Sequence, residues 1–330
     1  MKDIAVHHGE HAAPQKGLVR DHLAEYRPFS IEITLYGATR QTYEALTRVP
    51  GSFNRCIRGI RLLKERGLPL KLKTVPTTVN VHEVYEMKRF AEEEIGVEFK
   101  FDPFVNPRID CSQSPLSVRL TPEQAVELEF RDPARKAEYL KLAQNELASH
   151  HAPHGPGRYT CGGGQNGCAI TPGGQMRICV ISPQDGFNLR GASFAEGWHG
   201  GLREVRETPR ARQTICSRCQ IQNLFGMCPA HGELESGDAE IPVEFLCQTA
   251  HLRAYTLGVS VPEHGDCPCC SSGAHFSRLR ESAKRLQESS FNIEKIIPLP
   301  HPGSALPVLQ AGGACSAGGC SPRKEPSLRP

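Results

Sequence analysis

The stretch SIEITLYG, residues 30–37, indicates how the first part of the chain folds. It is a short β-branched run that ends in a glycine turn, which is the pattern of a buried strand. A helix is expected to follow, because Cys56, Ile60 and Leu63 are spaced four and three residues apart and Gly67 is placed to end it. This part of the sequence therefore predicts a strand that is followed by a helix.

The same alternation occurs again further along the chain. LKLKTV, residues 70–75, alternates along one face and predicts a second strand, and VEFKFD, residues 97–102, predicts a third. The helix between them is expected to bury one stripe, made of Val84, Met87, Ala91 and Ile95 and followed by Gly96. TPEQ, residues 121–124, has the pattern of a capping box with proline at the first helical position. Strands that alternate with helices predict an α/β fold with a parallel sheet and helical crossovers.

The number of strand–helix units is too small for a complete barrel. Only three are visible, and residues 21–28 have the pattern of a helix end whose preceding strand is absent. Three strands cannot close a barrel. We therefore expect this part to be the second half of a larger fold.

Length and composition limit the partners that the chain can have. Its 330 residues allow two domains with their own cores. A net charge of +3 is too small to indicate nucleic acid, and the basic run of residues 203–212 is expected to be a solvated face. No stretch reaches the ~18 apolar residues of a membrane span, and residues 1–15 lack the apolar core of a secretory signal. These features predict a cytoplasmic protein with no membrane or nucleic-acid partner.

The cysteines are the strongest signal in the sequence. Fourteen of them in a reducing compartment need a reason other than disulfides. Cys56 lies on an apolar helix stripe and is expected to be a core residue. Seven others crowd into one quarter of the chain and are candidate metal ligands: Cys161, Cys168, Cys179, Cys216, Cys219, Cys228 and Cys247. Their spacing includes Cys161-x12-Gly174-x4-Cys179, in which glycines let the backbone turn tightly enough for thiolates to converge.

Three kinds of chemistry fit these thiols. A structural zinc site would take four of them in a tetrahedron. Redox chemistry could use the Cys216-x2-Cys219 pair alone, but no thioredoxin-like strand precedes it. Iron–sulfur clusters, each normally held by four cysteines, would use seven or eight. Two sites of four thiols leave the seven cysteines one ligand short.

The strand–helix units followed by this cysteine pattern resemble radical SAM enzymes with a C-terminal SPASM domain, over roughly residues 20–255. The resemblance implies the C-terminal half of a (β/α)6 partial barrel, followed by a small cysteine-rich iron–sulfur domain and a disordered tail. The implied divisions are a disordered N-terminus at 1–20, the partial barrel at 21–150, the SPASM domain at 151–255, and a helix with a Pro/Gly/Cys-rich tail at 256–330.

The family also implies how the thiols are shared between clusters. One auxiliary 4Fe–4S cluster would use Cys161, Cys179 and Cys228, with Cys168 as the fourth ligand. A second would use Cys216, Cys219 and Cys247, but Phe225 stands where the family has its fourth cysteine. The resemblance therefore implies one auxiliary cluster and leaves a second, at best three-thiol site open.

A second departure from the family concerns S-adenosylmethionine. Family members cleave it at a cluster held by CxxxCxxC, and no such motif occurs in these 330 residues. The expectation is an N-terminally truncated or split form that uses S-adenosylmethionine only if the missing half of the barrel is supplied. By resemblance, Thr34 and Asn80 would lie near the S-adenosylmethionine pocket.

Two hypotheses about function remain open, and with them the question of whether the chain is itself an enzyme. In the first, it belongs with enzymes that modify a peptide or protein by radical chemistry, served by a low-potential electron donor such as ferredoxin or flavodoxin and by a separate chain carrying CxxxCxxC. In the second, it is a non-catalytic iron–sulfur or zinc module that transfers electrons or acts as a scaffold.

The last part of the chain carries weaker signals. Residues 275–290 predict an amphipathic helix with Phe276, Leu279, Ala283 and Leu286 on one stripe, and the chain from Ile297 is expected to be disordered. CPCC at 267–270 and CSAGGC at 315–320 lie outside the family pattern. Because adjacent cysteines rarely reach one metal together, incidental thiols are the favoured interpretation. Metal binding, or replacement of the ligand missing at Phe225, is the alternative.

Overall fold

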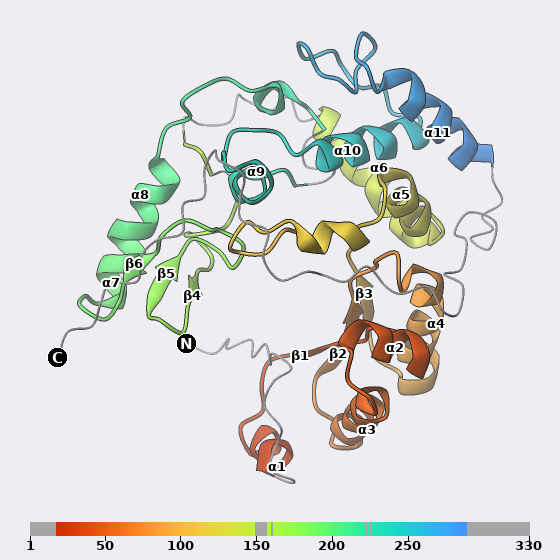
Figure 1. Cartoon of the computed structure of the whole chain (residues 1–330), viewed down its shortest axis with the longest axis vertical. Coiled ribbons are helices and arrows are strands. Elements are labelled where there is room, and N and C mark those ends of the chain that lie inside the picture. The colour runs from red at the N-terminus through yellow and green to blue at the C-terminus, as the bar shows by residue number, and fades with distance from the viewer. Residues whose placement is uncertain (1–17, 149–156, 160, 222–223, 225, 289–330) are drawn as a thin grey trace. The chain divides into compact units, whose positions relative to one another are not determined.

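The computed structural model describes residues 18–148, 157–159, 161–221, 224 and 226–288. Their contacts divide the chain into two compact units (Figure 1). Unit 1 contains the described residues 18–105 and 118–120, and unit 2 contains 106–117 and 121–288. Phe225, the segment of residues 149–156 and the tail beyond residue 288, with the CSAGGC motif, lie outside the described residues.

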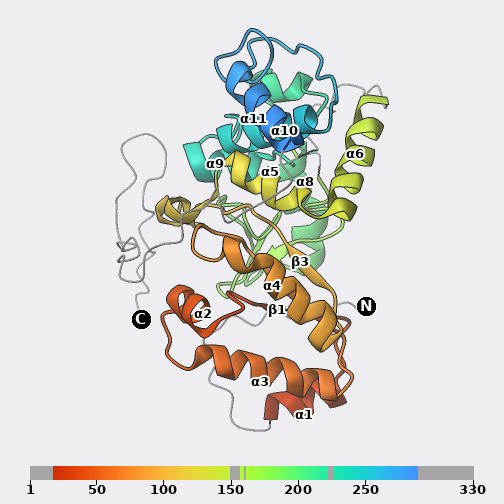
Figure 2. The same cartoon turned by 90° about the vertical axis from the view of Figure 1, so that its right-hand side faces the viewer.

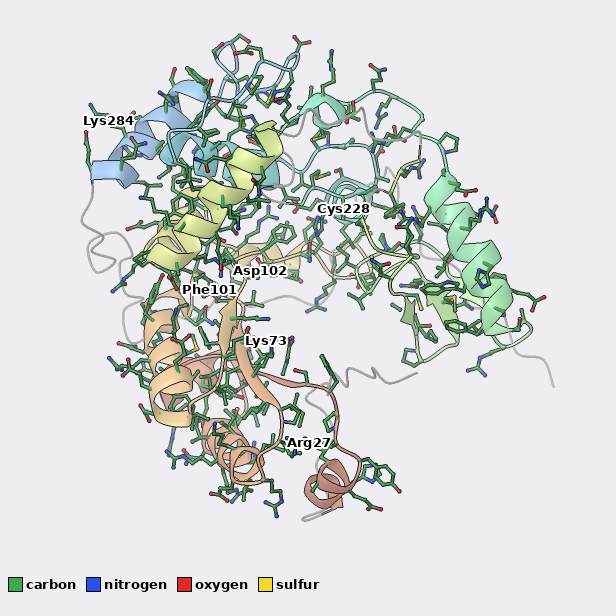
Figure 3. The ribbon with its side chains drawn as sticks, turned by 180° about the vertical axis from the view of Figure 1, so that it is seen from behind. Arg27, Lys73, Phe101, Asp102, Cys228 and Lys284 are labelled. Carbon is green, nitrogen blue, oxygen red and sulfur yellow. The ribbon has the colours of Figure 1, made fainter. Side chains whose placement is uncertain are left out.

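Unit 1 is built on a three-stranded parallel sheet. The strands β1 (Ile31–Thr34), β2 (Leu70–Thr74) and β3 (Phe99–Phe101) follow one another in that order, with Leu72 aligned between Ile33 and Phe99. Figure 3 shows Lys73 and Phe101 on the adjacent strands β2 and β3. The three predicted strands and their parallel order are confirmed.

Helices connect the strands, as the apolar periodicity predicts. After α1 (Leu18–Glu25), the first crossover holds α2 (Arg40–Thr47) and α3 (Ser52–Glu65), and the second holds η1 (Val81–Glu83), α4 (Val84–Arg89) and the π-helical turn η2 (Phe90–Ile95). Gly67 and Gly96, at φ +61° and +69°, adopt the left-handed conformation that follows a helix end. The predicted stripe of α4 and η2 is buried, and Cys56 on α3 is half-buried.

A buried carboxylate joins the loop after β1 to the loop after β2. Glu83 is 4% exposed, and its oxygens accept hydrogen bonds from the backbone of Ala38 (2.7 Å) and the hydroxyls of Thr39 (2.7 Å) and Thr42 (2.6 Å). Burial alone would raise the pKa of Glu83, but these hydrogen bonds stabilise the ionised form and lower it. Glu83 therefore holds the start of α2 against the η1 turn of the second crossover.

Replacing Glu83 with glutamine is expected to destabilise the protein by about 1–3 kcal/mol at neutral pH, because an amide nitrogen would face hydrogen-bond donors. The ionised Glu83 stabilises the fold fully above its ordinary pKa of 4.5, and this contribution is lost as pH falls through the lower folded-state value. The difference between variant and wild type should therefore shrink at acid pH. Urea unfolding of both proteins on either side of that pKa measures it, with the exposed Glu86→Gln as control. A difference that is the same at both pH values would contradict the role of the charge.

Unit 2 contains a helical part with its own core. Its helices are α5 (Pro122–Phe130), α6 (Pro133–Ala148), α9 (Pro229–Ser236), α10 (Glu244–Thr256) and α11 (Phe276–Glu288). Helix α10 packs against both α5 and α11, which lie beside it in Figures 1 and 2. The capping box of Thr121 and Gln124 is formed, and the predicted stripe of α11 is buried apart from Phe276, which is partly buried.

The other part of unit 2 is a small antiparallel sheet with short helices. Strand β4 (Ala169–Ile170) pairs with β5 (Gln175–Arg177), and β5 pairs with β6 (Phe187–Asn188). The short helical segments are α7 (Phe194–Glu196), η4 (Gly197–Gly201), α8 (Leu202–Glu207) and η5 (Ile215–Arg218), and η3 (Ser114–Val118) lies at the unit boundary. The PGG turn of residues 172–174 joins β4 to β5 as a hairpin.

The boundary between the two compact units lies at a different residue from the domain boundary expected from the sequence. The units separate after Val105, whereas the sequence places the boundary at residue 150, because α5 and α6 pack with α10 rather than with the parallel sheet. Helix α1 begins at Leu18, inside the N-terminal segment expected to be disordered. Helix α11 belongs to the same unit as the cysteine-rich region. None of the described helices is long and apolar enough to cross a bilayer.

Candidate metal centres

Ten of the eleven described cysteines of unit 2 form two groups, and Cys111 belongs to neither. The hairpin group lies on the β4–β5 hairpin, its flanking loops and the start of α9, and consists of Cys161, Cys168, Cys179 and Cys228. The helix group lies on η5, α10 and the loop between α10 and α11, and consists of Cys216, Cys219, Cys247, Cys267, Cys269 and Cys270 with His251 and His264. All described cysteines are without disulfides.

The hairpin group gathers thiols from distant parts of the sequence. Cys179 follows β5 and, with Cys168, packs against the core cluster of Tyr159, Met176, Ile178 and Leu202. Cys179 and Cys161 lie close enough to Cys228 for a charge on either to raise its pKa. Gly174 has φ +79°, and a Cβ there would lie 3.1 Å from Arg190, so the turn that brings Cys179 back requires glycine.

Arg206 on α8 fixes the loop that carries Cys161. Its guanidinium donates to the carbonyl oxygens of Cys161 (2.6 Å), Gly163 and Tyr159 (3.4 Å). The sequence analysis missed this role, because the basic run of residues 203–212 has the pattern of a solvated face. Carbonyl acceptors in a loop leave no side-chain signal that could have revealed it.

Cys228 is the N-cap residue of α9, at the point that Figure 3 labels. Burial raises the pKa of its thiol to about 11, and the amide groups of His231 and Ala230 in the first turn of the helix oppose that shift. Without a metal the sulfur is therefore protonated at neutral pH. A metal ion would displace the proton, since the thiolate is the ligand.

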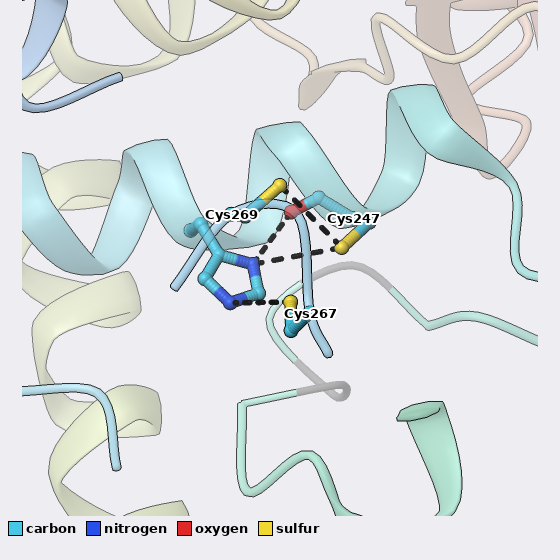
Figure 4. A group of neighbouring side chains, drawn as sticks. Cys247, Cys267 and Cys269 are labelled. Carbon is cyan, nitrogen blue, oxygen red and sulfur yellow. Dashed lines mark hydrogen bonds between the residues drawn. The ribbon is translucent and has the colours of Figure 1, made fainter. Parts of the chain in front are cut away.

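The helix group is buried and much tighter. Cys267, Cys269 and Cys270 are at most 1% exposed and belong to the core formed by α5, α10 and α11. The sulfur of Cys247 lies 3.7 Å from that of Cys269 and 3.8 Å from Nδ1 of His251 (Figure 4). The interpretation of CPCC as incidental thiols is therefore not supported. The loop after α10 folds back into the core and brings these sulfurs to the α10 ligands, which no local pattern shows.

Ligand atoms in the helix group form two overlapping sets in which all atoms lie within 4.8 Å of one another. One set is Cys247, His251, Cys267 and Cys269, and the other is His251, His264, Cys267 and Cys270. Among the described residues, the hairpin group does not form such a tight set. Around one ion the ligands are close together, whereas the four sulfurs of a cubane cluster bind four separate irons and lie farther apart. The two groups therefore suit different metals.

Burial and contacts within the helix group shift the pKa values of its thiols and of His264. Hydrogen bonds from the thiols of Cys247 and Cys269 lower the pKa of Cys267, so Cys267 is the first of the three to ionise. The sulfurs of Cys219 and Cys267 raise the pKa of His264 to about 10. Burial raises the pKa of Cys216 to about 12. Cys267 is therefore the thiol best prepared to bind a cation.

The CxxC pair of Cys216 and Cys219 faces the same centre. The backbone amide of Cys219 donates to the carbonyl of Cys216 (3.2 Å), which closes the tight turn expected of such a pair. A small pocket is lined by both cysteines together with Cys247, His251 and His264. The structure thus brings together Cys216, Cys219 and Cys247 and adds candidate ligands that the family pattern does not contain.

The two residues that the resemblance implies for S-adenosylmethionine lie at strand ends in unit 1. Thr34 is the last residue of β1 and is half-buried. Asn80 is fully buried: its oxygen accepts from Thr77 (backbone, 2.7 Å), and its amide donates to the carbonyls of Tyr36 (3.1 Å) and Val75 (3.3 Å). Asn80 therefore joins two loops of the fold, and its contact with a cofactor stays a prediction.

His251 and His264 are candidate ligands that the sequence analysis did not name. His251 lies four residues after Cys247 on α10, which places both on one face of the helix. His264-x2-Cys267-x2-Cys270 also has the spacing of a metal-binding turn. These two spacings were the available signals.

The chain is similar to enzymes named AdoMet-dependent heme synthase. It is 24% identical to that of Oleidesulfovibrio alaskensis over 235 residues, which cover 65% of this chain and 60% of the relative. It is 24% identical over 238 residues to that of Nitratidesulfovibrio vulgaris (64% and 63% coverage) and 23% identical over 226 residues to that of Methanosarcina barkeri (63% and 64%). The chain spans less than two thirds of the length of these curated relatives.

These relatives are radical SAM proteins, which agrees with the radical SAM part of the resemblance. Their names indicate heme synthesis rather than peptide or protein maturation. No family model matches the chain, and no solved structure matches it.

Proposed function

We propose that this chain is an iron–sulfur protein related to radical SAM enzymes, and that its hairpin group holds an auxiliary 4Fe–4S cluster of the SPASM type. The observation that carries the proposal is the convergence of Cys161, Cys179 and Cys228, which come from three separate segments, on one open thiol group with Cys168 on the same hairpin. Four thiols from a glycine-rich frame suit such a cluster. Because Cys161 is exposed, an electron donor can approach this centre.

The cluster would serve electron transfer to a substrate handled by radical chemistry. The names of the relatives favour a heme precursor as that substrate. A peptide or protein substrate is the second candidate, because the Cys161-x12-Gly174-x4-Cys179 spacing is that of the SPASM maturases. The donor would be a low-potential protein such as ferredoxin or flavodoxin, and the site of action the cytoplasm.

Cleavage of S-adenosylmethionine would depend on a CxxxCxxC cluster that these residues do not supply. The reaction needs an iron that protein ligands leave open, and no CxxxCxxC motif occurs in these residues. A hairpin-group cluster with four cysteine ligands offers no open position. Thr34, at the end of β1, would then contribute to the nucleotide pocket only in the combined protein. If this chain were a non-catalytic electron carrier, the same cluster would be present, but adding a CxxxCxxC chain would restore no cleavage.

Iron and acid-labile sulfide after anaerobic reconstitution test the proposal. We expect about four iron and four sulfide atoms per chain, with the broad visible absorption of a 4Fe–4S cluster. Reduced with dithionite, the chain alone should make no 5′-deoxyadenosine above the background without protein. A folded protein without sulfide would overturn the iron–sulfur assignment, and turnover by the chain alone would overturn the auxiliary role.

A further inference from the structure

The helix group contains a set of four side chains with the geometry of a mononuclear metal site. Nε2 of His251 lies 3.7 Å from the sulfur of Cys267 and 3.7 Å from that of Cys270. Nδ1 of His264 lies 3.5 Å and its Nε2 4.0 Å from the sulfur of Cys270. With zinc–sulfur bonds of about 2.3 Å and zinc–nitrogen bonds of about 2.0–2.1 Å, a tetrahedron has sulfur–nitrogen edges of about 3.5 Å. The sulfur–nitrogen distances measured to Nε2, 3.7 Å twice for His251 and 4.0 Å for His264, are within about 0.5 Å of those edges.

Hydrogen bonds to backbone carbonyls orient both imidazoles. Nδ1 of His251 lies 2.8 Å from the carbonyl oxygen of Cys247, and Nδ1 of His264 lies 2.8 Å from that of Pro262. With each Nδ1–H donating to its carbonyl, Nε2 is the nitrogen of each ring that is left to bind a metal when the ring is neutral. This is how outer hydrogen bonds select the ligating nitrogen of a metal-bound histidine.

The four side chains of this set are buried, so a bound cation would stabilise them. His251 is 0% exposed, Cys267 and Cys270 are 1% exposed and His264 is 6% exposed. Sulfur–nitrogen contacts of 3.5–4.0 Å are weak hydrogen bonds, and buried polar groups without strong partners destabilise a core. The loop of residues 257–275 also lacks helices and strands, although Cys267, Cys269 and Cys270 on it are core residues. A cation would supply the missing interaction for the side chains and tie the loop to α10.

Two features favour this set over the overlapping set of Cys247 and Cys269. Cys267 and Cys270 form a CxxC turn closed by a hydrogen bond from the amide of Cys270 to the carbonyl of Cys267 (3.2 Å), which suits two thiolates on one ion. All four members are buried, whereas Cys247 is half-buried. The intervening Cys269 is paired with Cys247 instead, as Figure 4 shows.

We propose that His251, His264, Cys267 and Cys270 bind one zinc ion, which closes the core between α10 and α11. Two thiolates and two imidazoles around one ion form the tetrahedral donor set typical of structural zinc. Zinc binds the thiolate form of both cysteines and the neutral form of both imidazoles, so the protons that these four groups still carry are released to solvent, and four protein ligands leave no position for a substrate. This site lies outside the hairpin group and does not depend on the iron–sulfur proposal.

Zinc content and zinc X-ray absorption of the full chain provide the first test. We expect about one zinc ion per chain, and a coordination shell of two sulfur and two nitrogen atoms. The absorption measurement needs no variant, so it is independent of any folding defect. A shell with three or four sulfurs, iron at this site, or a folded protein that binds no added zinc would each overturn the proposal.

Two adjacent cysteines provide a matched pair of variants. Cys270 belongs only to the proposed set and Cys269 only to the other, and both are at most 1% exposed. Cys270→Ser is expected to weaken zinc binding by more than about 100-fold, beyond the 10–100-fold that loss of an outer partner costs, while Cys269→Ser keeps the ion. Competition with a chromophoric chelator measures both. The opposite order, or equal losses, would contradict the assignment.

The same preparations separate this proposal from the proposed function. Sulfide and four iron atoms report on the hairpin group, and zinc reports on the helix group. If the chain holds zinc without sulfide, only the iron–sulfur proposal fails. If it holds the cluster without zinc, only the zinc proposal fails.

Discussion

Replacing Glu129 with alanine is expected to lower the free energy of unfolding by about 3–5 kcal/mol, because it leaves the charge of Arg253 buried without its partner. Glu129 on α5 is 0% exposed and Arg253 on α10 is 2% exposed. The pair is bidentate: the guanidinium nitrogens Nε and Nη2 lie 2.9 Å and 2.7 Å from the carboxylate. The expected loss is a large fraction of the 5–15 kcal/mol that typically stabilises a protein.

The surroundings of this pair explain why its loss is severe. Glu129 also accepts from Tyr139 (3.0 Å) and Arg135 (3.2 Å), and Arg253 donates to the carbonyl of Leu224 and lies 4.4 Å from the centre of the Tyr139 ring. One substitution therefore leaves several buried donors without an acceptor. It also loosens α10 against α5, and α10 carries His251. The variant should consequently release the proposed zinc ion at lower denaturant concentration than the wild type.

Denaturant unfolding with two controls tests this prediction. Glu207 forms an exposed ion pair with Arg203, so Glu207→Gln is expected to cost less than about 0.5 kcal/mol. The double variant Glu129→Leu/Arg253→Met removes both buried charges and should be more stable than Glu129→Ala. If Glu129→Ala lowers the free energy of unfolding no more than Glu207→Gln does, the ion pair of Glu129 and Arg253 does not hold α5 and α10 together.

Replacing Cys228 with serine is expected to remove about four iron and four sulfide atoms per chain, the content of one whole 4Fe–4S cluster. Cys228 is the candidate ligand of the hairpin group that lies at the N-cap of α9, and no described cysteine lies within that helix. Loss of one of four ligands leaves an iron without its thiolate. A cluster exposed in this way is expected to be lost during purification.

This substitution separates metal loss from misfolding. Serine is among the residues preferred at a helix N-cap, so it suits the position that Cys228 occupies at the start of α9. Circular dichroism should therefore show a folded variant. Cys56→Ser, on α3 in unit 1, is the control and should keep full iron content. Unchanged iron in Cys228→Ser, or equal loss in Cys56→Ser, would contradict the assignment.

Much of unit 1 could be predicted because local patterns decide it. The alternation of Leu70, Leu72 and Thr74 identifies β2, and the stripe from Val84 to Ile95 identifies the second crossover. Each pattern reflects burial of one face, which depends only on the period of the strand or helix. The sequence also predicts the turn at Gly174, since few other residues adopt a positive φ there.

The sequence by itself thus determined the parallel α/β unit, the tight glycine turn before Cys179 and the buried stripe of α11. Only the tertiary structure decided which thiols lie together. Cys267 and Cys270 join His251 because the loop after α10 folds back into the core, and Glu129 meets Arg253 because α5 packs against α10. These contacts join residues far apart in the chain, up to 124 positions for Glu129 and Arg253. Their formation depends on the packing of whole helices, which no short-range period encodes.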